Sequence, residues 1–239
     1  MKIKKMKIDH KIKWKNKVRG VLLVILVLSI VYAIIKIINA PSEADQFAKV
    51  KSDYVLMLLQ CLLGIFVMMI PSIIERKKSI DIPDSMEIAF FVFLFCAIFL
   101  GEVQDFYYLI PHWDVILHAF SGCMLGALGF SLVNFLNNTE RLQFNLSPSF
   151  VALFAFCFAL SVGTLWEVYE YLFDGLFNLN MQKFILADGT VLAGREALSD
   201  TMDDLIVDVI SASIIPIAGY FLLKKDRAKE IAVAKKIEK

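Results

Sequence analysis

Residues 113–136, WDVILHAFSGCMLGALGFSLVNFL, decide the fold of this chain. Apart from Asp114 and His118 in its first two turns, the stretch has no charged or imidazole side chain. A helix that crosses about 30 Å of hydrocarbon needs about 20 largely apolar residues. The stretch therefore predicts a transmembrane helix whose polar residues lie at its N-terminal end.

Five other stretches have a similar length and character, and the composition agrees with them. The predicted spans are 21–38, 54–74, 86–103, 113–136, 150–173 and 205–223. Of the 239 residues, 58% are apolar, against about 45–50% in a soluble domain. This excess argues against soluble and disordered proteins, and the net charge of +1 argues against nucleic-acid binding. We expect an all-α, polytopic bundle of six helices whose partner is the lipid bilayer.

Basic residues divide the chain into three parts and orient it. Segment 1–20 and tail 224–239 are rich in Lys and Arg, and they flank the membrane domain 21–223. Further basic residues, Arg76 to Lys78, lie between the second and third spans. Because Lys and Arg favour the cytoplasmic side, both termini are predicted to lie inside. We expect a multi-pass protein of the bacterial cytoplasmic membrane with its N-terminus inside.

With this orientation, the polar residues of the last four spans gather at the outer helix ends. Asp114 and His118 are four residues apart, and Glu167 and Glu170 are three apart, so each pair shares a helix face. The last three aspartates of the cluster follow one another at intervals of four. The candidate pocket residues are Glu102, Asp105, Asp114, His118, Glu167, Glu170, Arg195, Asp200, Asp204 and Asp208.

Many carboxylates with one imidazole suit a hard or borderline divalent cation. The metal-ligand candidates are His118, Glu167, Glu170, Asp204 and Asp208. Arg195 is a candidate anchor for an anionic substrate. Crowded carboxylates can instead hold a proton, or form a hydrogen-bonded network that only joins the helices. No catalytic residue is assigned, and a divalent metal is the one cofactor that the pattern suggests.

The longest outer connection, residues 174–199, contains an Asp188-Gly189 turn between two short apolar runs. This pattern predicts a small hairpin over 184–192. The hairpin could be a lid or an ordinary loop. Asp174, where this connection begins, is expected to be a solvated loop charge.

Four ordered motifs resemble the YjdF-like family of bacterial membrane-spanning proteins. The motifs are Gly101-Glu102 through Tyr107-Tyr108, Trp113-Asp114-x-x-x-His118-x-x-Ser121-Gly122, Trp166-Glu167-x-x-Glu170, and Asp200-Thr201-x-x-Asp204-Leu205-x-x-Asp208. The resemblance implies a membrane fold and location, without a biochemical activity.

A fainter resemblance links the chain to VanZ-like membrane proteins, which are associated with glycopeptide-antibiotic tolerance. The pair Asp114/His118, the Gly194-Arg195 dipeptide and Ser199 match that pattern. Asp208 departs from it, because that family has Asn there.

Three functions remain open from the sequence. The first is a divalent-cation site that acts on an envelope or lipid-linked substrate. The second is a non-catalytic scaffold whose polar network orders the bundle. The third is an ion- or proton-coupled transporter, although the apolar inner halves of the spans argue against a polar path through the membrane. Whether the protein is an enzyme stays open.

Overall fold

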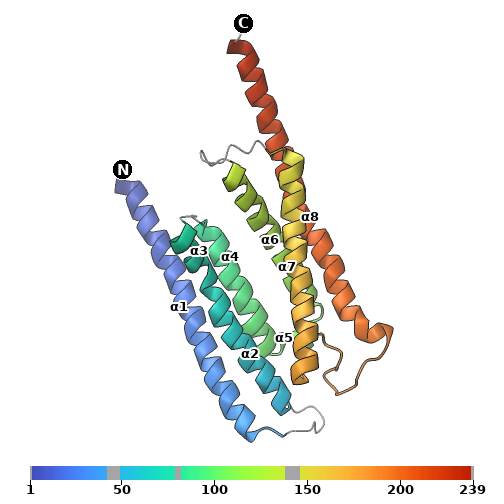
Figure 1. The fold of residues 1–239 in the computed structure, drawn as a ribbon. Coiled ribbons are helices and arrows are strands. Elements are labelled where there is room, and N and C mark those ends of the chain that lie inside the picture. Colours follow the sequence, from blue (N-terminus) through green and yellow to red (C-terminus); the bar gives the residue numbers. More distant parts are fainter. Residues whose placement is uncertain (1, 42–48, 79–81, 138–145, 238–239) are drawn as a thin grey trace. The chain divides into compact units, whose positions relative to one another are not determined.

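The computed structural model describes residues 2–41, 49–78, 82–137 and 146–237, so Met1 and the last two residues of the basic tail lie outside the described residues. Figure 1 shows an all-helical chain, and no named strand occurs in the described ranges. The helices are α1 (Lys2–Asn39), α2 (Lys51–Met68), α3 (Ile70–Lys78), α4 (Asp84–Leu94), the π-helix η1 (Phe95–Val103), α5 (Phe106–Leu109), α6 (Trp113–Asn137), α7 (Pro148–Phe177) and α8 (Arg195–Ile237).

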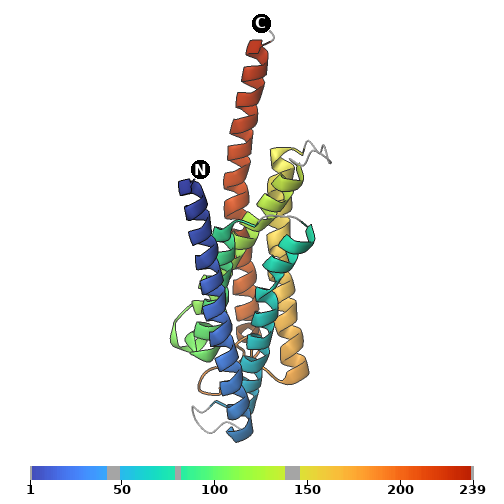
Figure 2. The same cartoon turned by 90° about the vertical axis from the view of Figure 1, so that its left-hand side faces the viewer.

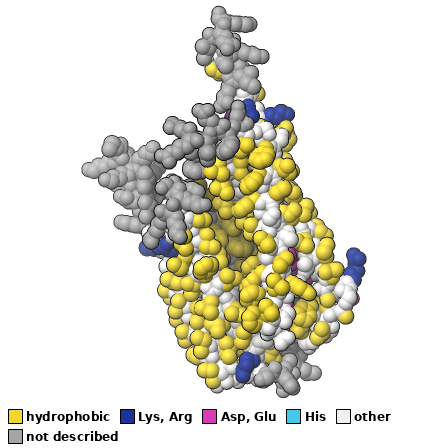
Figure 3. Space-filling model, viewed as in Figure 1, with side chains coloured by type: hydrophobic (Ala, Val, Ile, Leu, Met, Phe, Trp, Pro, Cys, Tyr) yellow, Lys and Arg dark blue, Asp and Glu magenta, His cyan; other side chains and the backbone are white. Residues whose placement is uncertain are grey.

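Six helical segments among the described residues are long and apolar enough to cross a membrane. They are Trp14–Asn39, Lys51–Glu75, Asp84–Val103, Trp113–Val133, Pro148–Phe177 and Arg195–Lys229. Hydrophobic side chains cover much of the face drawn in Figure 3, and few charged side chains interrupt them. The predicted all-α fold with six spans is therefore confirmed.

Local geometry differs from uniform α-helices at two places. The second span is interrupted at Met69, between α2 and α3. Pro71 explains this break, because it has no N–H to bond the carbonyl four residues earlier. The third span ends as the nine-residue π-helix η1, and π-helical turns occur often at functional sites. By contrast, α8 continues through Pro216 and into the basic tail as one helix.

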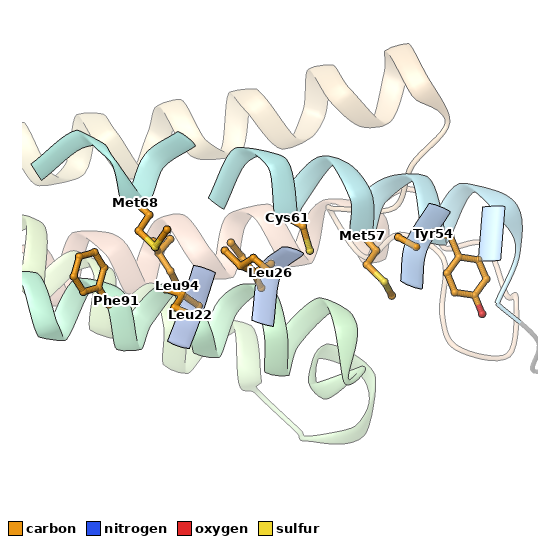
Figure 4. Close-up of a cluster of buried hydrophobic side chains, with 10 residues drawn as sticks. Leu22, Leu26, Tyr54, Met57, Cys61, Met68, Phe91 and Leu94 are labelled. Atoms are coloured by element: carbon orange, nitrogen blue, oxygen red, sulfur yellow. The ribbon is translucent and has the colours of Figure 1, made fainter. Parts of the chain in front are cut away.

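The chain divides into two compact units, which we describe separately. Unit 1 consists of residues 1–117 and 169–200. Its core forms where α1 packs against α2 and α4, which lie side by side in Figures 1 and 2. Figure 4 shows buried side chains of this core, which include Leu22, Leu26 and Phe91.

Unit 2 consists of residues 118–168 and 201–239, and small residues bring its helices together. A Cβ added to Gly126 of α6 would meet the carbonyl oxygen of Ala212 at 3.1 Å and Cδ of Pro216 at 3.2 Å. Gly129 of the same helix lies equally close to Ala155 of α7. Close backbone approach of this kind is typical of membrane helix pairs, and it positions the polar side chains described next.

Candidate functional site

The candidate site is a buried histidine surrounded by three carboxylates, all within unit 2. The imidazole of His118 on α6 lies between Glu167 of α7 and Asp204 and Asp208 of α8. Its Nε2 is 3.6 Å from Oε1 of Glu167 and 3.8 Å from Oδ2 of Asp204. Its Nδ1 is 3.3 Å from Oδ1 of Asp208. None of the four residues is more than 6% exposed.

Helical spacing and two glycines explain this convergence. Asp204 and Asp208 are one turn apart, so both carboxylates leave the same face of α8. The Asp208 carboxylate occupies the space where a Cβ of Gly163 on α7 would be. In the same way, the hydroxyl of Ser211 occupies the space where a Cβ of Gly122 would be. The glycines therefore admit the polar side chains of α8.

The contact between His118 and Asp208 selects one tautomer of the imidazole. A carboxylate only accepts hydrogen bonds, so Nδ1–H of His118 donates to Oδ1 of Asp208. In neutral imidazole the lone pair then lies on Nε2, which faces Glu167 and Asp204. The second oxygen of Asp208, Oδ2, is buried and has no hydrogen-bond partner among the described residues.

On the Nε2 side the geometry favours a cation or added protons. The distances of 3.6 and 3.8 Å are longer than hydrogen bonds. They are close to the separation of about 3–3.6 Å between donor atoms that share a metal ion at about 2.0–2.2 Å. Three buried carboxylates would repel one another and the Nε2 lone pair unless a cation or protons neutralise them. The cluster can thus hold a divalent ion or a protonated imidazole.

The structure confirms that four sequence-predicted residues lie together, whereas their role as ligands stays a prediction. The other six candidates belong to unit 1. Asp105 pairs with Lys49, and Arg195 is exposed at the start of α8. Asp114, one helical turn before His118 on α6, has a carboxylate oxygen within 4.8 Å of a ring nitrogen of His118. Glu170 is buried, while Glu102 and Asp200 are half-buried.

The loop after α7 is held by Asp174, whose predicted role as a solvated charge is wrong. The residue is buried, and its two carboxylate oxygens accept hydrogen bonds from the backbone N–H groups of Met181 (2.8 Å) and Gln182 (2.9 Å). The predicted hairpin is confirmed by an antiparallel bridge between Ile185 and Val191. The loop in unit 1 is therefore anchored from within the helix that precedes it.

Lys183 is a cation near the acidic residues that was not among the predicted pocket residues. Its Nζ lies 4.5 Å from the ring centroid of Tyr107 and 5.8 Å from that of Tyr108. Burial disfavours the ammonium, but the nearby Glu102 and other negative groups outweigh burial and raise the pKa of Lys183 above its usual range. Tyr107 and Tyr108 are far from Lys183 in sequence, so no local pattern reveals this contact, in which the aromatic rings favour a nearby cation.

Replacing Asp174 with alanine should loosen this loop, because two buried N–H groups would lose their acceptor. We expect a loss of about 1–3 kcal/mol and faster hydrogen exchange at Met181 and Gln182. Asp188→Ala is the control, since that exposed carboxylate bonds only within its own turn, to the N–H of Thr190. Equal exchange in both variants would contradict the anchoring role.

The fold and the cluster together define a polytopic, all-helical membrane protein with a buried histidine–carboxylate site. More specifically, the chain belongs to the family described as "Predicted membrane protein (DUF2238)", whose model matches residues 18–225. It is 26% identical over 141 residues to an uncharacterized protein of Thermotoga maritima. That match covers 59% of this chain and 64% of the relative, which is less than two thirds of the relative's length. No solved structure matches the chain.

Proposed function

We propose that His118, Glu167 and Asp204 bind a divalent cation in the membrane domain. The observation that carries the proposal is the position of two buried carboxylate oxygens at 3.6 and 3.8 Å from Nε2 of one imidazole. Asp208 is a positioning residue, because it holds Nδ1–H and so aims the Nε2 lone pair at the ion. Carboxylates commonly orient metal-binding histidines in this way.

The donor set indicates which ions are favoured. One imidazole nitrogen and carboxylate oxygens suit Zn²⁺ or Mn²⁺, whereas Mg²⁺ and Ca²⁺ prefer all-oxygen sites. Three protein ligands leave a coordination position for water or substrate, which is the pattern of catalytic sites. When bound, such an ion would polarise a substrate oxygen or activate water.

We assign the protein to metal-dependent chemistry on an envelope or lipid-linked substrate. His118 lies in the second turn of α6, and Asp204 and Asp208 lie in the third and fourth turns of α8. Glu167 lies in the second half of α7, so the cluster lies in one half of the apolar spans rather than at their middle. Because Lys and Arg favour the cytoplasmic side, we infer that both termini lie in the cytoplasm of a bacterium and that the cluster lies toward the outer leaflet. We also infer that the matched family is the YjdF-like family, because the motifs lie inside residues 18–225.

Metal addition to the detergent-purified protein tests the proposal. At an ion concentration of about 100 Kd, binding stabilises the native state by about 2.7 kcal/mol, which raises Tm by about 5–10 °C in a chain of this size. We expect this shift with Zn²⁺ or Mn²⁺, together with about one ion per chain by elemental analysis.

The double variant Glu167→Gln/Asp204→Asn distinguishes a metal site from a structural network. Removing two like charges should raise the metal-free Tm and abolish the response to metal. A scaffold network would instead lose stability in this variant, and the wild type would not respond to any ion. Asp203→Asn is the control, because that neighbouring side chain on α8 is exposed.

A further inference from the structure

Unit 1 has an apolar groove between α1 and the helix formed by α4 and η1. The groove has a volume of about 510 Å³. It is lined by six residues of α1 between Trp14 and Ile25, and by three residues between Phe91 and Phe95. Leu22 and Phe91, two buried residues of the core in Figure 4, form its floor.

The groove is amphipathic along its length. Lys17 is the one charged side chain among the lining residues, and it lies near the end marked by Trp14. Ile25 lies eight residues further along α1, about 12 Å at 1.5 Å per residue. Trp14 is 56% exposed, as is common for indoles at a membrane interface. The groove thus has a cationic end and an apolar end, like the binding site of a lipid.

Neighbouring charges leave Lys17 available for a ligand. Lys15 forms ion pairs with both Asp84 and Glu87, so the acidic residues at the start of α4 pair with Lys15 rather than with Lys17. No ion pair of Lys17 occurs among the described residues, and its side chain is exposed. An exposed ammonium at the mouth of an apolar groove complements an anionic headgroup attached to an acyl chain.

We propose that this groove binds one anionic phospholipid of the surrounding bilayer. The acyl chain lies against Leu22 and Phe91, and the phosphate contacts Lys17. The site is independent of the histidine–carboxylate cluster, which belongs to unit 2. Because one Lys near a membrane surface contributes about fivefold in affinity for an anionic lipid, phosphatidylglycerol should bind about fivefold more tightly than phosphatidylcholine.

Quenching of Trp14 by brominated lipids tests this site directly. In the variant Trp113→Phe/Trp166→Phe, Trp14 is the remaining indole of the chain's 3 tryptophans. In mixed micelles, brominated phosphatidylglycerol should quench Trp14 at about one fifth of the concentration that brominated phosphatidylcholine requires. Lys17→Gln should remove this preference, and Lys225→Gln on α8 should retain it.

Filling the groove provides a second test, which does not require the removal of the other two tryptophans. Val21→Phe should lower the number of phosphatidylglycerol molecules retained in native mass spectrometry, whereas Val31→Phe, further along the exposed face of α1, should not. Equal quenching by both lipids together with unchanged retention in Val21→Phe would overturn the proposal. A change from dimer to monomer on filling the groove would overturn it in favour of a second copy of the chain.

Discussion

Replacing Lys15 with alanine should lower the free energy of unfolding by about 2–3 kcal/mol. Lys15 on α1 lies 2.7 Å from Oε2 of Glu87 and 3.0 Å from Oδ1 of Asp84 on α4. The Glu87 side chain is only 3% exposed, so its charge would remain buried without a partner. Breaking a fully buried pair costs about 3–5 kcal/mol, and the partial exposure of Lys15 and Asp84 reduces this value. Reversible unfolding in mixed micelles measures the change.

The double variant Lys15→Met/Glu87→Leu is the matched control. It removes both charges and keeps apolar volume, so its stability should be within about 1 kcal/mol of the wild type. If the single and double variants lost the same stability, packing of the Lys15 side chain rather than the ion pair would join α1 to α4. Lys17→Gln, two residues along α1, should leave stability unchanged because Lys17 is exposed.

The six spans were predictable because their signal is local. A run of about 20 apolar residues has one stable form in a bilayer, since a helix satisfies its own backbone hydrogen bonds. The π-helix η1 has no comparable signal, because the residues 95–103 are as apolar as the α-helix before them. The change in η1 to hydrogen bonds between residues five apart depends on packing with other helices. The one feature of η1 that the sequence predicted was its polar end at Glu102.

The candidate site was predictable in part for the same reason. His118, Asp204 and Asp208 carry their signal in helical spacing and in the expense of placing charge within an apolar span. The ion pair between Lys15 and Glu87 joins residues far apart in sequence, so no periodicity reveals it. Asp174 likewise is indistinguishable in sequence from a solvated loop residue until the chain folds back onto it.

Replacing Gly163 with alanine should weaken the proposed metal site, although Gly163 itself contributes no ligand. The new Cβ would overlap the carboxylate of Asp208, which would have to move away from Nδ1 of His118. Overpacking costs about 1–3 kcal/mol, and loss of a carboxylate that orients a ligand lowers metal affinity by about 10–100-fold. Measuring Tm at increasing metal concentrations gives both the loss of stability and the loss of metal affinity.

Gly175→Ala on the same helix should have the opposite effect on stability. A Cβ there meets nothing within 4 Å, so the variant should gain about 0.5–1 kcal/mol from the lower backbone entropy of alanine and bind metal normally. In the double variant Gly163→Ala/Asp208→Ala the overlap disappears, so stability should recover while metal affinity stays low. If affinity recovered as well, Asp208 would not orient His118. If Gly163→Ala alone bound metal like the wild type, the ion would lie elsewhere.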